Sequence, residues 1–444
     1  MKRSAWRYLW TSQDIRKKLI ITILLLIIYR LAANIPVPGI NREVLSQLAN
    51  STSPGASLFN LLDLLSGGTI SNFSILAMGV YPYITAQIII QLLTPIIPAL
   101  ERRLKDNPRE GRVLMEKWTT MLTIPMAFLS AIGQVNIFNT MVQTGSVLNT
   151  PFGFTGESFL PTITLLVSMV AGTMFGIWLG QLISEFGIPN QGLSLIIFAG
   201  IISRIPTKLF GILGNKQDGW WQLLLMIVIL ALTIFAIVFV QQGRRNVPVL
   251  FPGRRVGNRM SMPVRSNLPL MVNMAGMIPL IFAQTFLSFP ALLASWFVGE
   301  KTSGFWYWIY SNFSGSTGWI YPVVYFVLVV AFRFFYTDVL FTQQNYGETL
   351  KRQGAQIPGV VRGGPTQKYL TKVQRRITFP GAFFLGFVAV LPFILGAILP
   401  ISQSTLFVIS AAGLLIVVGV VRDTFTIIET ELKVHGYDES IIKG

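Results

Sequence analysis

The chain has 444 residues, of which 52% are hydrophobic and 12% are charged. Ordinary soluble domains carry about 25% charged residues, so this composition excludes a typical soluble domain and predicts a polytopic membrane protein. The absence of cysteine excludes disulfide bonds and thiolate metal sites, and 35 Lys and Arg against 18 Asp and Glu give a net charge of +17.

Ten apolar segments follow one another along the chain. A run of about 20 apolar residues spans a bilayer as a helix. The first run follows a basic cluster, as the core of a signal peptide does, but nine further runs favour a retained helix over a cleaved one. The sequence therefore predicts an all-α integral membrane protein with ten transmembrane helices, at residues 19–35, 74–97, 118–138, 160–184, 193–210, 220–241, 269–290, 319–337, 377–397 and 401–421.

Between the first and second runs, a short apolar segment is interrupted at Gly67-Gly68. In lipid, each unsatisfied backbone group costs several kcal/mol unless protein or a water-filled cavity surrounds it. An uninterrupted helix would avoid that cost. The interruption therefore predicts that residues 58–70 lie at the mouth of a cavity and that the following span lines its wall.

Lys and Arg are distributed unevenly over the segments that connect the spans. With the N-terminus placed inside, 29 of the 35 fall on the inner side and five on the outer side, while Arg30 lies within the first span. Inner loops of membrane proteins are rich in Lys and Arg, so both termini are predicted to be cytoplasmic. The aromatic run Phe305–Tyr310 then falls outside, where aromatic side chains gather at the interface.

Two inner loops, 242–268 and 338–376, are long and basic. The first contains short β-prone stretches and predicts a hairpin with a turn at Pro252-Gly253. Two interpretations of the charge remain open: a topology signal that contacts anionic lipid, or a docking surface for an acidic partner or for ribosomal RNA. In the first loop the bases are Arg244, Arg245, Arg254, Arg255, Arg259 and Arg265.

The spans divide into two groups of five around residues 205–219. Because five is odd, the second group must cross the membrane in the opposite direction to the first, as in an inverted repeat. The sequence therefore predicts an N-terminal half at 1–204 and a C-terminal half at 220–444, with a path for the transported molecule between them.

The spans offer little chemistry of their own. Carriers and pumps normally keep charged groups near the middle of the membrane, whereas the span centres here are almost free of them. No metal-binding, nucleophilic or phosphate-binding motif is visible. We therefore expect no enzyme activity and no cofactor, and a passive conduit driven by a partner. The alternatives are an inverted-repeat secondary transporter of a small solute and an integral-membrane enzyme.

Several motifs resemble the SecY family of protein-conducting channels: IPVPGI at 35–40, AMGVYPYITAQIIIQLL at 77–93, GTMFGIWLGQLISEFGIPN at 172–190, PLMVNMAGMIPLIFAQ at 269–284 and GLLIVVGVVRD at 413–423. The resemblance runs from about Trp6 to about Lys443. It implies a central pore that passes unfolded secretory proteins and releases transmembrane helices sideways into lipid, with 205–219 as the hinge. It also implies an aliphatic pore ring formed by Val80, Ile84, Leu193, Ile197, Ile281 and Ile416.

The resemblance assigns the interrupted segment as a plug, with Leu58, Phe59, Leu61, Leu62, Leu65, Gly67 and Gly68 as its residues. A lateral gate would lie between spans two–three and seven–eight. Thr85, Gln91 and Gln284 are polar groups that either bond across this gate when it is closed or pack within their own half.

The partners implied by the resemblance are small SecE-like and SecG-like membrane subunits, the SecA motor ATPase and the ribosome, besides signal peptides, nascent chains and the lipid bilayer. The location would be the bacterial plasma (inner) membrane. Two local departures affect the assignment: Asn190-Gln191-Gly192 precedes span five, and Pro358–Gly364 is a variant of the family's loop tip. The expected docking residues are Arg244, Arg245, Arg254, Arg255, Arg362 and Lys368.

Overall fold

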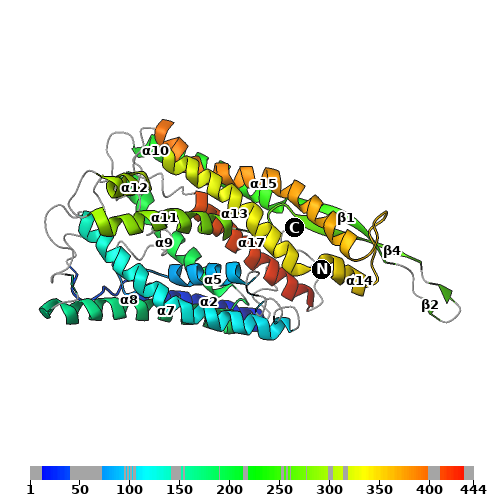
Figure 1. Ribbon diagram of the computed structural model, residues 1–444, viewed down its shortest axis with the longest axis horizontal. Helices are drawn as coiled ribbons and strands as arrows, with labels where there is room; N and C mark the ends of the chain where they lie inside the picture. Colours follow the sequence, from blue (N-terminus) through cyan, green and yellow to red (C-terminus); the bar gives the residue numbers. More distant parts are fainter. Residues whose placement is uncertain are drawn as a thin grey trace.

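A computed structural model describes most of the chain: residues 13–40, 73–94, 97, 100, 103, 107–141, 152–153, 156–189, 191–213, 219–251, 255–256, 259–260, 262–276, 278–298, 304–313, 319–398 and 411–434. Long helices make up most of it, and a β-hairpin projects from one end (Figure 1). The elements are α2 (Gln13–Ala32), α5 (Tyr81–Leu93), α7 (Pro108–Met141), η1 (Gly156–Ser158), α8 (Phe159–Phe186), α9 (Gly192–Leu213), α10 (Gly219–Gln242), β1 (Arg244–Phe251), β2 (Arg255–Val256), β3 (Arg259–Met260), β4 (Val264–Met271), α11 (Ile278–Val298), α12 (Phe305–Phe313), α13 (Ile320–Gln344), α14 (Tyr346–Arg352), α15 (Gly364–Ile398) and α17 (Ala411–Val434).

Within the described residues, five helical stretches are long and apolar enough to cross a membrane: Val113–Val135, Phe159–Phe186, Leu224–Gln242, Ile320–Arg352 and Gly364–Gly396. Shorter apolar helices cover Gly192–Ser203 and Ile278–Ala291. Large apolar side chains also face outward; on α10, for example, Leu232, Phe235 and Phe239 are all exposed. Exposed apolar area costs about 25 cal/mol per Å² in water and nothing comparable in hydrocarbon, so these surfaces suit a lipid environment.

The helices pack as two groups, which contact each other at two interfaces. In the first group α8 contacts α2, α7 and α9, and in the second α13 contacts α11 and α15. The groups lie in the lower and upper parts of Figure 1. Between them, α11 packs against α5 and α7, while α9 packs against α10 and α17.

The α8–α9 crossing depends on two glycines. A Cβ atom on Gly192 would lie 1.8 Å from the carbonyl oxygen of Gly180, and one on Gly180 would lie 2.8 Å from Leu193 Cδ2. The backbone N–H of Gly192 also donates to Ser184 Oγ at 3.1 Å. Small residues let membrane helices approach closely, and this approach sets where α9 begins.

The predicted span 74–97 begins differently from our expectation, because residues 73–80 form turns and the helix starts only at Tyr81. Phe73 has a φ of 39° and Gly79 a φ of 52°. The backbone of this segment bonds to another part of the chain: Val37 N donates to the Phe73 carbonyl at 3.0 Å, and Ile75 N to the Ile35 carbonyl at 2.9 Å. The IPVPGI motif thus supplies the partners that a helix would otherwise provide.

Several other helix ends differ from the predicted span boundaries, and three of them show why. Residues 269–271 belong to β4, so α11 starts only at Ile278. In the opposite sense, α15 begins at Gly364, well before the predicted 377, and α17 continues past Arg422 to Val434, beyond the predicted end at 421. Hydropathy locates the apolar part of a segment, whereas a helix continues through polar residues until its backbone geometry changes.

The predicted hairpin is present, so the fold is not purely α-helical. Strand β1 pairs antiparallel with β4, with Arg244 opposite Met271 and Phe251 opposite Val264. Pairing resumes in β2 and β3, where Val256 lies opposite Arg259. Pro252 and Gly253, where the turn was predicted, lie outside the described residues.

Candidate functional site

Five of the six expected ring residues lie in one apolar cluster where three parts of the chain meet. Val80 ends the turn before α5, Ile197 lies on α9 and Ile416 on α17; all three are buried together. Half-buried Leu193 and Ile84 pack against this cluster.

The sixth residue, Ile281 of α11, is buried in a neighbouring cluster, and Ile84 packs against that cluster as well. Ile84 therefore contacts both clusters of side chains. The helical bond from Ile84 N to the Val80 carbonyl, 3.1 Å long, keeps these two side chains one turn apart.

The first cluster consists almost entirely of aliphatic side chains, apart from Tyr29 and Phe198. A narrow aliphatic constriction excludes water and therefore ions, while its side chains bind no particular sequence. Among the residues that the structure describes, no group of His, Asp and Glu is arranged to hold a metal ion.

All the expected plug residues lie outside the described part of the chain: Leu58, Phe59, Leu61, Leu62, Leu65, Gly67 and Gly68.

A seam runs where α5 and α7 meet α11 and α13. At one part of it, Ile88 of α5 is buried with Phe282 of α11 and Tyr336 of α13. Gln91, one of the three expected gate residues, has its side chain close to that of Tyr336 and so reaches from α5 to α13.

The other two expected gate residues are placed differently. The Thr85 hydroxyl donates to the Tyr81 carbonyl of its own helix at 3.0 Å. Gln284 on α11 is 3% exposed. Of the three, Gln91 is the one described beside a polar side chain of another helix.

A second part of the seam is lined by small residues. Ala127 and Ala131 of α7 and Ala291 of α11 have no exposed surface and belong to one cluster. Small side chains let the two helices pack closely by dispersion alone.

The two long basic loops form one unit. Leu250 of β1 and Gln356 exchange backbone hydrogen bonds, each 2.8 Å long. Beneath them is an apolar core to which β1, β4, α13, α14 and α15 all contribute. Gln367 of α15 joins α14 to this unit by accepting a bond from Gly347 N at 2.7 Å. We call β1, β4, α14, residues 353–363 and the start of α15 the basic module.

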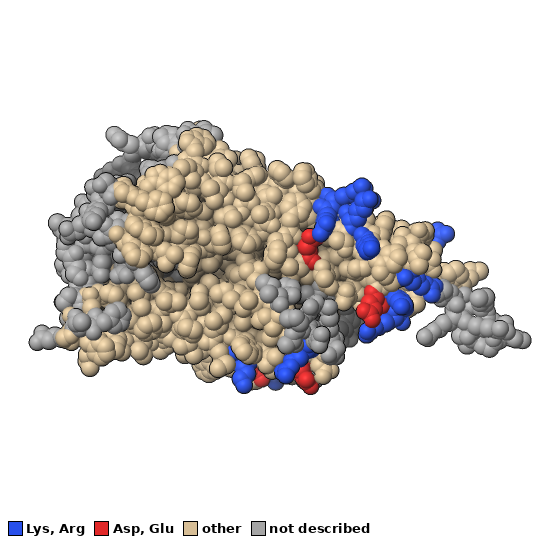
Figure 2. All heavy atoms as spheres, in the orientation of Figure 1, with Lys and Arg blue, Asp and Glu red and all other residues tan. Residues whose placement is uncertain are grey.

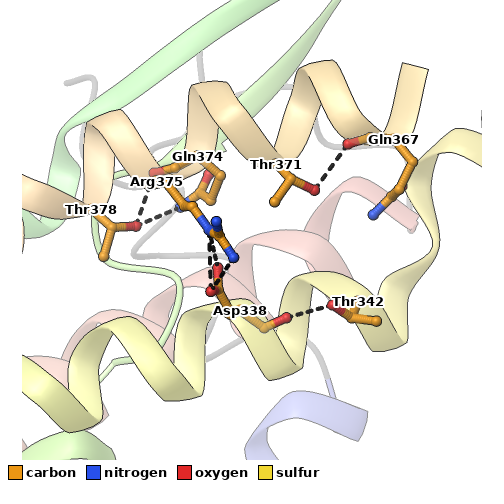
Figure 3. Close-up of polar contacts among 7 residues, drawn as sticks. All are labelled: Asp338, Thr342, Gln367, Thr371, Gln374, Arg375 and Thr378. Atoms are coloured by element: carbon orange, nitrogen blue, oxygen red, sulfur yellow. Dashed lines mark hydrogen bonds and ion pairs between the residues drawn. The ribbon is translucent and has the colours of Figure 1, made fainter. Parts of the chain in front are cut away.

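The basic module carries a concentration of exposed Lys and Arg, seen on the right of Figure 2. The start of α15 lines a surface groove of about 610 Å³ whose basic residues are Lys368, Lys372, Arg375 and Arg376. Arg375 forms an exposed ion pair with Asp338 of α13, with Nη2 2.8 Å from Oδ2 (Figure 3). Exposed pairs of this kind contribute little to stability, about 0–1 kcal/mol.

The expected docking residues lie on this module where they are described. Arg244, Arg245, Arg362 and Lys368 are exposed. Arg254 lies outside the described residues, and of Arg255 only the backbone in β2 is described. Arg362 stands in a turn bounded by Gly359 and Gly363, which have φ values of 78° and 92°.

Sequence analysis missed one feature, a buried arginine. Arg333 of α13 is 1% exposed and donates to Asn273 Oδ1 and, at 2.8 Å, to the Val272 carbonyl. The available signal was a single Arg within the apolar run AFRFF, but the sequence does not indicate its neighbours.

The chain matches the SecY family model over residues 74–425. Curated "Protein translocase subunit SecY" proteins match nearly full length: that of Streptomyces galbus is 35% identical (98% of this chain and 99% of the relative), and that of Escherichia coli is 34% identical (97% and 95%). Two solved structures match over all of both chains with a TM-score of 0.63 and 17% identity, one described as "The structure of a protein conducting channel" and the other as a study of the plug domain of the SecY protein.

The fold is therefore that of a helical membrane protein of the SecY type. The chain belongs to the SecY family, whose curated members named above are protein translocase subunits. This assignment confirms the resemblance of the motifs and does not favour the solute-transporter alternative.

Proposed function

We propose that this SecY-family translocase subunit passes unfolded secretory proteins through a pore between two inverted five-span halves, 1–204 and 220–444, with 205–219 as the hinge. Ring residues Val80, Ile84, Leu193, Ile197, Ile281 and Ile416 form the constriction. The observation that carries the proposal is the gathering of aliphatic side chains from α5, α9 and α17, next to that of α11, in adjoining clusters. Such a collar blocks ions and yields to a passing chain.

The ring is tested by replacing Val80 and Ile416 together with Gly. We expect ion conductance of reconstituted channels to rise several-fold, because a wider and less apolar collar holds water. The matched control replaces Val327 and Ile227, both exposed on the helix surface, with Gly, so it removes a Val and an Ile side chain outside the cluster. Equal conductance in the two double variants would show that the cluster does not seal the pore.

The plug is a separate part of the proposal, supported by the interruption at Gly67-Gly68 and by the single charge, Asp63, between Leu58 and Ile70. A segment held by apolar contacts alone is readily displaced by a substrate. Deletion of residues 60–68 should raise ion leak in planar bilayers while translocation persists. Unchanged conductance in the deletion variant would count against the plug.

The seam between α5–α7 and α11–α13 serves as the lateral gate, through which apolar segments reach lipid. The basic module faces the cytoplasm together with both termini, in a bacterial plasma membrane. It docks the SecA motor or the ribosome, and SecE-like and SecG-like subunits complete the channel. The chain itself does no catalysis, so the energy for transport comes from the docked partner.

A further inference from the structure

The junction between the hairpin and α11 is held by side chains from three other helices. We call Met271, Val272 and Asn273 the hairpin root. Arg333 of α13 donates to the Val272 carbonyl and to the Asn273 side chain. Gln374 of α15 donates to the Met271 carbonyl at 3.2 Å.

The third contact comes from α17. Arg422 Nη1 donates to the Gln241 carbonyl at the end of α10 at 3.1 Å, and its Nη2 approaches Met271 Sδ at 3.6 Å. The root is also bonded to the residue before β1, since Val272 N donates to the Gly243 carbonyl at 2.8 Å. Both strands of the hairpin are thus fixed where they enter the helical body.

The root packs closely against α15 at Gly381. A Cβ atom on Gly381 would lie 2.9 Å from Val272 Cγ1 and 3.4 Å from an Arg333 guanidinium nitrogen. A glycine at this position allows α15 to close over the junction. Asn273 and Ala275 are buried there as well.

Of the side chains that hold the root, Arg333 has a large desolvation cost because its charge is buried. It is almost fully buried, and its described hydrogen-bond acceptors are an amide oxygen and a backbone carbonyl, not a carboxylate. Burying a charge without an opposite charge is expensive, and an apolar side chain of similar volume would avoid the cost. What an apolar side chain or a lysine lacks is a planar fork that bonds two groups on consecutive residues.

We propose that Arg333 is a positioning residue that fastens the hairpin root and the start of α11 to α13, so that force on the basic module moves α11 and α13 as one body. The proposal rests on the proposed lateral gate. Only residues 274–277 separate the root from α11, so the chain offers little slack. With the Arg333 guanidinium bonded to the root, a displacement of the hairpin also moves α11 at its seam with α5. Without these bonds, α11 is no longer held in one position at the seam.

The absence of cysteine makes this directly testable in the full-length protein in lipid nanodiscs. Nitroxide labels are attached to Gln87→Cys on α5 and Phe286→Cys on α11, both exposed positions. Arg333→Gln and Arg333→Lys should each broaden the distance distribution between the labels. Asn273→Ala keeps the arginine and removes one of its acceptors, so it should broaden the distance distribution to a smaller degree. This variant tests the proposal if the Arg333 variants fail to fold.

The matched control is Arg352→Gln, which removes an exposed arginine of α14 that pairs with Glu348 on its own helix; its distribution should equal that of the parent. Arg333→Lys separates charge from geometry. If it behaves as the parent does, charge alone suffices and the fork has no role. Unchanged distributions in Arg333→Gln and Asn273→Ala together would also overturn the proposal.

The transport readout uses secretory proteins with signal peptides of decreasing hydrophobicity. Loss of the fork should raise export of the weakest signal by about threefold or more, the lower end expected for one hydrogen bond in a membrane. A different result is expected if the seam is not the lateral gate. Arg333→Gln would then still broaden the distance distribution between the labels, but Gln91→Leu would leave export of weak signals unchanged.

Discussion

Arg362 is exposed at a turn held by Thr366, whose hydroxyl donates to the Val361 carbonyl at 2.7 Å. If this arginine only sets topology, Lys should replace it, because charge near the membrane is what counts. If it docks a partner, Lys should not suffice, because only Arg pairs bidentately with a carboxylate or phosphate.

We therefore expect Arg362→Glu to abolish motor-driven translocation into proteoliposomes and Arg362→Lys to reduce it. Arg352→Lys, a change at an exposed arginine of the same module, is the matched control. Insertion and folding should be normal in all three variants, since the side chains of Arg362 and Arg352 are both exposed. Full motor-coupled transport by the Glu variant would show that this residue does not dock a partner.

Residue chemistry was predictable in part. The resemblance of AMGVYPYITAQIIIQLL supplied Val80 and Ile84, and their shared face follows from their spacing of four. Gln91 was singled out because it is polar in an apolar run, but its partner Tyr336 lies on a distant segment that the sequence does not connect to it. Arg333 was missed for the same reason: its acceptors lie 60 and 61 positions away.

At the scale of elements, the seam combines few polar bonds with extensive apolar packing. A hydrogen bond between membrane helices contributes about 0.6–2 kcal/mol, or roughly 3- to 30-fold in an equilibrium. Gln91→Leu removes the polar contact with Tyr336, so it should lower the signal-peptide hydrophobicity needed for export, measured with a graded series of signals. Gln284→Leu should act in the same direction if its amide also bridges the seam.

Thr85→Val is the control for this series, because the Thr85 hydroxyl bonds within its own helix; its effect should be the smallest. If the signal-peptide hydrophobicity needed for export is identical in Gln91→Leu and the parent, Gln91 does not help to hold the seam closed.

Element types were predicted better than element ends. Apolar runs located most of the helices, yet the start of span two and the β4–α11 boundary depend on bonds to residues far along the chain, Ile35 and Val37 in one case and Arg333 in the other. The joining of the two basic loops also escaped prediction, because it rests on the Leu250–Gln356 pairing and a shared apolar core.

At the scale of the whole molecule, the charge distribution makes a prediction about orientation. The chain has no cysteine, so single cysteines can be placed at will. Val361→Cys in the basic module should react with a membrane-impermeant maleimide only from the cytoplasmic side. Trp308→Cys on α12 should react only from the opposite side, and both positions are exposed. Reaction of both from one side would contradict the positive-inside assignment.

The alanine contact between α7 and α11 has a consequence for how lipid takes part in opening. When these helices separate, Ala127, Ala131 and Ala291 exchange one hydrocarbon neighbour for another, because acyl chains are as apolar as the side chains they replace. The three alanine side chains themselves carry no polar group that would be left without a partner. The work of opening there reduces to lost close packing and to ordering of the acyl chains that enter, so it should vary with the thickness and fluidity of the surrounding bilayer. Acyl chains then compete with a released transmembrane helix for the same alanine faces of α7 and α11.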